Sequence, residues 1–265
     1  MGAARSDKWD SGELYEPYVG RWSRPVARGF LGWLAQPPGR EWLDVGCGTG
    51  ALTETILALC EPRAVTGVDP SAGYIEFAKT HLRDGRMQFK VADAQTMPID
   101  SASVDVVVSG LVLNFIPDPR KASAEMRRVA RPSGVVAAYV WDYAGKMELM
   151  RHFWDAAVEL NPKAVDLDEG RRFQICKPDR LETLFTAAGL KEVETSTIHV
   201  PTVFRDFDDY WSPFLGGQAP APGYNMSLNE AERAALRELL HRRLPIRPDG
   251  SIHLVARAWA VKGRV

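Results

Sequence analysis

A short apolar strand that runs into a glycine-rich loop is the feature that most constrains this chain. Residues 41–50 read Glu-Trp-Leu-Asp-Val-Gly-Cys-Gly-Thr-Gly, which places Asp44 two positions before the first of three glycines. Glycine lets the backbone turn tightly off a strand end and approach a ligand closely. The helix predicted from Ala51 to about Leu59 would aim its N-terminal amides at the same place. This segment therefore predicts a ligand-binding loop.

Acidic residues close two further predicted strands. Asp69 ends the strand over residues 64–69, about 20 residues beyond the last glycine, a spacing that suits a carboxylate accepting from both hydroxyls of a ribose. A third strand leads to Asp93, and a fourth, over residues 104–110, ends in small polar residues. Strands that alternate with helices predict a parallel, doubly wound α/β sheet whose ligand lies outside the carboxyl ends of the strands.

Together these motifs resemble the class I S-adenosylmethionine-dependent methyltransferases, in particular their small-molecule, UbiE-like branch (methyltransferase type 11). The resemblance covers residues 40–140, about two-fifths of the chain. It implies a seven-stranded Rossmann-like sheet with an antiparallel last strand. The motifs that carry it are Leu43 to Gly50, Gly67 to Ser71, Val91 to Gln95, Met97-Pro98, Leu113 to Asp118 and Arg131 to Gly134.

The resemblance also implies a role for each part of the site. Asp44 and the glycine loop would hold the methionine part of the cofactor, and Asp69 its ribose. Tyr74 would stack on the adenine, and Asp93 would accept from the adenine amino group. The full set of implied cofactor-binding residues is Tyr18, Arg21, Asp44, Gly46, Cys47, Gly48, Gly50, Asp69, Pro70, Ser71, Tyr74, Asp93, Ala94, Gln95, Ser109 and Leu111.

Several of these residues have an ordinary structural alternative. Asp69 precedes Pro-Ser and is a possible helix cap, and Tyr74 is a possible core ring. Cys47 occupies a position that needs a small side chain, which favours packing over reactivity. Arg21 is equally well a solvated charge, with Tyr18 packed on the sheet.

Outside the core, the sequence predicts an arm and two insertions. Aromatic residues, among them Trp9 and Tyr15, mark an N-terminal arm that we expect to close over the cofactor site. Both insertions follow strands whose carboxyl ends face the cofactor, so we expect them to roof the substrate site. A helix cap is predicted at Ser227, with Glu230 completing a capping box. The predicted divisions are the arm 1–39, the cofactor-binding core 40–142, the first insertion 143–178, and the remaining core 179–265 with a second insertion at about 205–245.

The composition of the chain limits the kinds of binding partner that we expect. The formal net charge of the 265 residues is −1, so no overall field attracts nucleic acid or an anionic membrane. The three cysteines show no paired metal spacing, and no metal is predicted. The start of the chain lacks an apolar signal core, which indicates a cytoplasmic protein. The Asn/Asp-Pro-Pro-aromatic motif of base methyltransferases is absent, which argues against nucleic-acid bases as substrates.

The predicted activity is transfer of a methyl group from S-adenosylmethionine to a small, apolar or aromatic molecule, leaving S-adenosylhomocysteine. The accepting atom, oxygen, nitrogen or carbon, stays open. In-line displacement without a dedicated base is favoured, with His152 and Asp142 as candidate bases. Two competing functions remain. Residues 46–51 also satisfy a dinucleotide fingerprint, typical of an NAD-dependent oxidoreductase, and a protein of this fold can bind the cofactor without transferring methyl.

Overall fold

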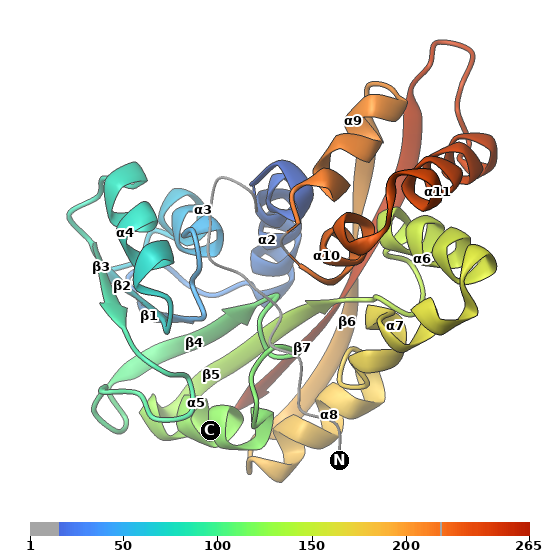
Figure 1. Cartoon of the computed structure of the whole chain (residues 1–265). Helices are drawn as coiled ribbons and strands as arrows, with labels where there is room; N and C mark the ends of the chain where they lie inside the picture. The colour runs from blue at the N-terminus through green and yellow to red at the C-terminus, as the bar shows by residue number, and fades with distance from the viewer. Residues whose placement is uncertain (1–15, 218) are drawn as a thin grey trace.

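The computed structural model describes residues 16–217 and 219–265. Trp9 and Tyr15, in the predicted N-terminal arm, lie outside the described residues. The described chain contains one seven-stranded sheet in the order β3-β2-β1-β4-β5-β7-β6 (Figure 1). Strands β1 to β5 pair in parallel, and β7 runs antiparallel to both β5 and β6. The predicted fold class, with its antiparallel last strand, is confirmed. The strands are β1 (Glu41–Val45), β2 (Ala64–Asp69), β3 (Met87–Val91), β4 (Val104–Gly110), β5 (Ala130–Trp141), β6 (Lys191–Phe204) and β7 (Ile252–Arg264).

Helices cover both faces of this sheet, as the continuous burial of β4 and β5 requires. One layer holds α2 (Arg21–Leu34), α3 (Ala51–Leu59) and α4 (Ala72–His81), and the other holds α5 (Pro119–Val129) and α8 (Pro178–Ala187) (Figure 1). Apolar periodicity orients these helices. In α2, Trp22, Val26 and Phe30 recur every four residues, and all three are buried.

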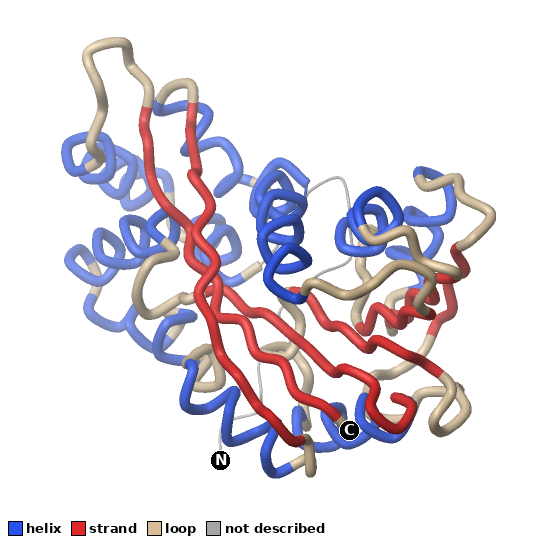
Figure 2. The backbone as a smooth tube through the Cα atoms, turned by 180° about the vertical axis from the view of Figure 1, so that it is seen from behind, coloured by secondary structure: helices blue, strands red, loops and turns tan. Residues whose placement is uncertain are grey.

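Beyond the end of β5, the last two strands continue as a two-stranded ribbon. Strand β5 pairs with β7 only from Val135↔Arg264 to Trp141↔Ala258, whereas β6 pairs with β7 as far as Phe204↔Ile252. The segments 200–204 and 252–256 therefore leave the sheet together, a long extension visible in Figure 2. The ribbon projects on the side where the parallel strands have their carboxyl ends.

The two insertions form a helical layer on this ribbon, which we call the roof (residues 143–176 and 205–251). Met147 bridges to Ala256 of the ribbon, which ties the start of the first insertion to it. The roof helices are α6 (Glu148–Leu160), α7 (Glu169–Arg172), α9 (Phe207–Trp211), α10 (Pro220–Ser227) and α11 (Glu230–Arg243), with short 3₁₀ turns η2 (Pro162–Asp166) and η3 (Ser212–Leu215). A π-turn, η1 (Glu16–Gly20), leads into α2.

The capping box predicted at Ser227 and Glu230 is wrong by two residues. Ser227 ends α10, where its hydroxyl donates to the carbonyl of Tyr224. The cap of α11 is Asn229, which accepts from the amide of Glu232, while the Glu232 carboxylate accepts from the amide of Asn229. Ser227 with Glu230 and Asn229 with Glu232 both fit the capping-box spacing, and the end of α10 at Ser227 places the cap of α11 at Asn229.

Aromatic side chains make the core of the roof. Phe153 stacks on Phe214 with ring centroids 4.5 Å apart, and the Tyr210 hydroxyl donates to the carbonyl of Leu149 at 2.9 Å. Within the described chain, none of these rings lines the main cavity. These rings therefore hold the roof helices together.

Candidate functional site

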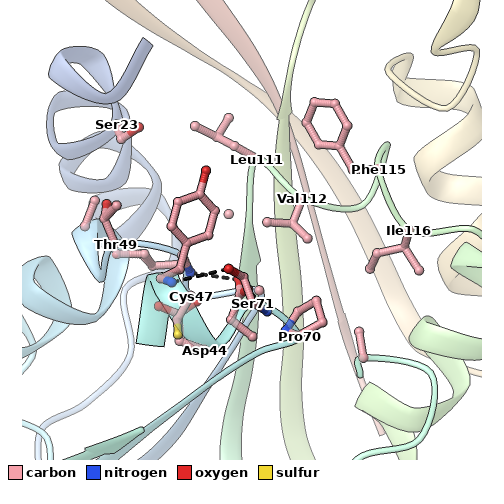
Figure 3. Close-up of a pocket in the computed structure, with 18 of the residues that line it drawn as sticks. Ser23, Asp44, Cys47, Thr49, Pro70, Ser71, Leu111, Val112, Phe115 and Ile116 are labelled. Atoms are coloured by element: carbon pink, nitrogen blue, oxygen red, sulfur yellow. Dashed lines mark hydrogen bonds between the residues drawn. The ribbon is translucent and has the colours of Figure 1, made fainter. Parts of the chain in front are cut away.

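A cavity of about 430 Å³ lies at the carboxyl ends of β1, β2, β4 and β5, where the fold class places ligands (Figure 3). It brings together most of the site that the sequence predicts. The predicted residues that line it are Asp44, Gly46, Cys47, Gly48, Asp69, Pro70, Ser71, Tyr74, Asp93, Ala94, Gln95 and Leu111.

The glycine loop forms the end of the cavity next to β1. Gly46, Gly48 and Gly50 have φ angles of +74°, +53° and +90°, in the left-handed region that disfavours side chains. A Cβ on Gly46 would also lie 2.5 Å from Cγ1 of Val112. The amides of Gly46 and Cys47 donate to the carbonyl of Val68 at 2.7 and 3.0 Å, which ties the loop to β2. At Gly46, glycine is therefore required by both backbone conformation and space.

Asp44 presents an unused hydrogen-bond acceptor to the cavity. Its side chain is 1% exposed, and one carboxylate oxygen accepts from the Thr53 hydroxyl at 2.7 Å. The other, Oδ1, has no hydrogen-bond partner in the described structure. Burial raises the pKa of Asp44 to about 7. A buried oxygen without a partner suits a cationic donor, such as the ammonium group of a methionine moiety.

Asp69 combines the structural and the ligand-binding possibilities. Its carboxylate accepts from the amide of Gly48 at 3.0 Å and from the amide of Ser71 at 2.8 Å. The N-cap of α4 is Ser71, whose hydroxyl accepts from the amide of Tyr74. Each carboxylate oxygen can accept two hydrogen bonds, so Asp69 retains capacity for the hydroxyls of a sugar. Burial raises its pKa.

The adenine end of the predicted site lies where β2 and β3 finish. Tyr74, on α4, is 9% exposed and lines the cavity. Asp93 follows β3 and accepts from both the amide and the side chain of Gln95, which shapes the turn. The ring and this turn both line the cavity.

Four predicted cofactor-binding residues do not line the cavity. Arg21 pairs with Asp209 of the roof at 2.9 and 3.1 Å, and Tyr18 is buried against the ring of Phe214. Ser109 donates its hydroxyl to the carbonyl of Val45 and supports the sheet behind the cavity. Gly50 caps α3 behind the loop. For Arg21 and Tyr18 the structure favours packing and ion pairing over contact with the cofactor.

The two candidate bases also lie outside the cavity lining. Asp142 is buried, and its carboxylate accepts from the Arg257 guanidinium and from the amides of Gly145 and Lys146. These hydrogen bonds hold the turn between β5 and α6 and tie it to β7. His152 is half-buried on α6, and burial lowers its pKa. Neither group reaches the space where a methyl acceptor would lie.

The sequence interpretation missed an apolar half of the cavity. Tyr139 and Trp141 stand two positions apart on β5 and so point to the same side at its carboxyl end. This period-two pattern at the end of a buried strand was the available signal. The other apolar and aromatic residues of this half are Val19, Val112, Phe115, Ile116 and Tyr143. Figure 3 shows Val112, Phe115 and Ile116 on the segment that follows β4, across the cavity from Ser23.

Comparisons with known proteins agree with this geometry. Residues 43–138 match a family described as a methyltransferase domain. The chain is 38% identical over 92 residues to a malonyl-[acyl-carrier protein] O-methyltransferase of Hahella chejuensis, covering 35% of this chain and 33% of that protein. It is 29% identical over 186 residues to the 2-methyl-6-phytyl-1,4-hydroquinone methyltransferase of Synechocystis, covering 69% of this chain and 57% of that protein. The chain thus spans about a third to somewhat over half the length of these two relatives.

A solved structure supports the fold over a larger share of the chain. Phosphoethanolamine N-methyltransferase 2 of Haemonchus contortus, solved with phosphomonomethylethanolamine and S-adenosylhomocysteine, aligns with a TM-score of 0.59 at 14% identity. The alignment covers 95% of this chain and 56% of that one. The glycine loop, the strand order and the family match agree on one family for residues 43–138, the class I S-adenosylmethionine-dependent methyltransferases.

Proposed function

We propose that this chain transfers a methyl group from S-adenosylmethionine, the cofactor of its family, to a small, apolar or aromatic molecule by in-line displacement. The observation that carries the proposal is one continuous cavity with two unlike halves. Carboxylates at strand ends line one half, and apolar and aromatic side chains line the other. The bound cofactor supplies a methyl group on a sulfonium, which departs as a neutral thioether.

In the cofactor half, the chain offers one group for each part of the molecule. Asp44 would accept from the ammonium through its unpartnered oxygen, and Asp69 would accept from the ribose hydroxyls. Tyr74 would stack on the adenine, beside the turn that Asp93 and Gln95 form. Together these contacts would hold the cofactor in the cavity.

In the acceptor half, the walls bind by shape and exclude water. Tyr139 and Trp141 line it from β5, and Phe115 and Tyr143 line it from the segments that follow β4 and β5. Such walls favour a flat, mainly apolar acceptor. Holding acceptor and methyl in line supplies up to roughly 7–11 kcal/mol of the barrier in favourable cases. Because Asp142 and His152 lie elsewhere, alignment and water exclusion are the sources of catalysis that we propose.

Two measurements test this function in sequence. S-adenosylhomocysteine should raise the unfolding temperature of the purified chain, and NAD should leave it unchanged. Stabilisation by NAD alone would instead support an oxidoreductase. S-adenosylmethionine with a labelled methyl should then label one member of a panel of small aromatic acceptors. Saturable cofactor binding without transfer to any acceptor would favour a protein of this fold that does not transfer methyl.

Tyr74 separates stacking from hydrogen bonding at the adenine end. Tyr74→Ala is expected to weaken S-adenosylhomocysteine binding by about 0.5–1.5 kcal/mol, because the ring face is lost. Tyr74→Phe, which keeps that face, should bind nearly as well as the wild type. Isothermal titration calorimetry compares the three proteins. Equal losses in both variants would show that the hydroxyl, and not the ring, contacts the cofactor.

The buried carboxyl of Asp44 predicts a pH dependence of stability. Its pKa is about 7 in the folded chain, against an ordinary 3.8, so between about pH 4 and pH 7 the folded state retains a proton that the unfolded chain has released. The free energy of unfolding of the ligand-free protein should therefore fall as the pH rises, by about 1.4 kcal/mol per pH unit from this group. Urea unfolding of the wild type and of Asp44→Asn at several pH values isolates the effect. The same slope in both proteins would contradict the prediction.

A further inference from the structure

The charged side chains of the cavity lie in one half only. Among the described residues that line it, the charged groups are the carboxylates of Asp44, Asp69 and Asp93, all in the cofactor half. No lysine, arginine or histidine of the described chain lines either half. This part of the wall therefore favours cationic ligands over anionic ones. A phosphate, carboxylate or phenolate in the acceptor half would find no cation on the described wall.

The acceptor half presents aromatic rings in place of charges. Four rings line it, two from β5 and two from the segments that follow β4 and β5, and they belong to Phe115, Tyr139, Trp141 and Tyr143. The centroid of the Phe173 ring lies 5.0 Å from that of Phe115 and 5.4 Å from that of Tyr143, so the last two rings lie near each other. The acceptor half thus offers several aromatic rings to one ligand.

Aromatic rings without a basic side chain among them suit a positive charge. The negative face of a ring attracts a cation, most strongly for tryptophan, and the attraction grows when the cation is removed from water. Sets of such rings bind quaternary ammonium groups. Trp141 and the rings beside it can therefore stabilise a positive charge that forms on the methyl acceptor.

Proton transfer gives the second constraint on the acceptor. Of the described residues that line the acceptor half, none carries a carboxylate, an imidazole or an amine, and Asp142 and His152 lie outside the cavity lining. A phenol, with a pKa of about 10, profits from a base that takes its proton, and a carbon acceptor needs similar help. The acceptor that fits this wall is one that reacts without losing a proton.

We infer that the methyl acceptor is an aromatic amine, which is methylated on nitrogen. The nitrogen lone pair forms the new bond to the methyl carbon, the carbon–sulfur bond breaks, and its electron pair stays on sulfur. The positive charge thereby moves to the nitrogen, beside the aromatic rings, and no proton leaves during the transfer. An aromatic amine is unprotonated at neutral pH, whereas an alkylamine with a pKa of about 10 holds a proton on its lone pair. The inference rests on the proposed function and names its accepting atom.

Two probes of equal shape and different charge test the inference. Phenyltrimethylammonium has the form of a methylated aromatic amine, and tert-butylbenzene replaces its nitrogen with carbon and so removes the charge. Both are titrated into protein saturated with S-adenosylhomocysteine, which occupies the cofactor half. The wild type should bind the cation about tenfold more tightly. Equal or weaker binding of the cation, or binding of neither probe, would overturn the inference. Failure to bind S-adenosylhomocysteine would instead reject the proposed function.

Two substitutions assign the preference to the rings. Trp141→Leu and Phe115→Leu each remove an aromatic face and keep an apolar side chain on the wall. Each should lower the ratio of the two affinities by about threefold. A general defect of the cavity would weaken both probes alike and leave the ratio unchanged. Phe153→Leu is the matched control, because Phe153 stacks on Phe214 in the roof and lies outside the lining. A wild-type ratio in both ring variants would contradict the inference.

Transfer of a labelled methyl gives an independent readout. The acceptor panel is arranged in pairs that differ only in the reacting group, such as aniline and phenol. At least one amine should receive the label on nitrogen, and its phenol partner should stay unlabelled. Label on oxygen or carbon would overturn the inference even if the cationic probe is preferred. Absence of label from every member would reject methyl transfer, and with it the inference.

Discussion

Replacing Asp69 by alanine is expected to weaken binding of S-adenosylhomocysteine by about 1–3 kcal/mol. Two ribose hydroxyls would lose a charged acceptor, and hydrogen bonds to charged groups are among the stronger ones in proteins. The substitution also frees the amides of Gly48 and Ser71, which Asp69 now holds. The cofactor loop would therefore lose part of its support along with its ligand contact. Isothermal titration calorimetry on the folded variant measures the loss.

Two further variants serve as controls for this result. Asp69→Asn keeps one acceptor oxygen, so it should lose less affinity than the alanine variant. Asp84→Ala removes a half-buried aspartate that pairs with Arg86 outside the cavity, and it should bind as the wild type does. If Asp69→Ala folds and retains full affinity, Asp69 does not belong to the cofactor site.

Gly46→Ala is expected to lower the free energy of unfolding more than any other single methyl added to the glycine loop. The left-handed backbone at φ +74° costs a residue with a Cβ roughly 1–2 kcal/mol. Overlap with the side chain of Val112 adds about 1–3 kcal/mol, as overpacking does elsewhere. Cofactor binding should fall as well, because Val112 lines the cavity and would have to move. Urea unfolding and calorimetry measure the two effects.

Other glycines separate strain from overlap. A Cβ on Gly48 would meet nothing within 4 Å, although φ is +53°, so Gly48→Ala should show the backbone cost alone. Gly32 lies in α2 with open space around it, and Gly32→Ala should stabilise the chain by about 0.5–1 kcal/mol. Equal losses at Gly46 and Gly48 would show that Val112 yields without cost.

The core strands could be predicted closely because their signals are local. Strands β2 and β4 are short apolar runs that end at aspartate and glycine, and their observed bounds match the predicted ones. The ribbon was not predicted, because its two strands pair with each other beyond the end of β5 and no local pattern shows that pairing.

For the site, the prediction succeeded where the chain itself brings the residues together. Asp44 and the glycines are contiguous, and Asp69 and Tyr74 lie on one strand–helix connection. Arg21 and Asp142 failed because their partners, Asp209 and Arg257, are 188 and 115 residues away. No local pattern shows that such a charge is already neutralised. The apolar half of the cavity was missed for the same reason, because its residues come from β5, from the segment after β4 and from η1, which are far apart in the sequence.

Because of the ribbon formed by β6 and β7, the second insertion of the roof can change in evolution independently of the cofactor site. Phe204 and Ile252 pair across it, so the 47-residue segment between them, about 205–251, leaves and re-enters the structure at adjacent points. The whole segment can therefore be replaced, in evolution or by protein engineering, without interrupting a strand that contacts the glycine loop. Related chains should therefore vary most in length between these two residues while keeping the same cofactor.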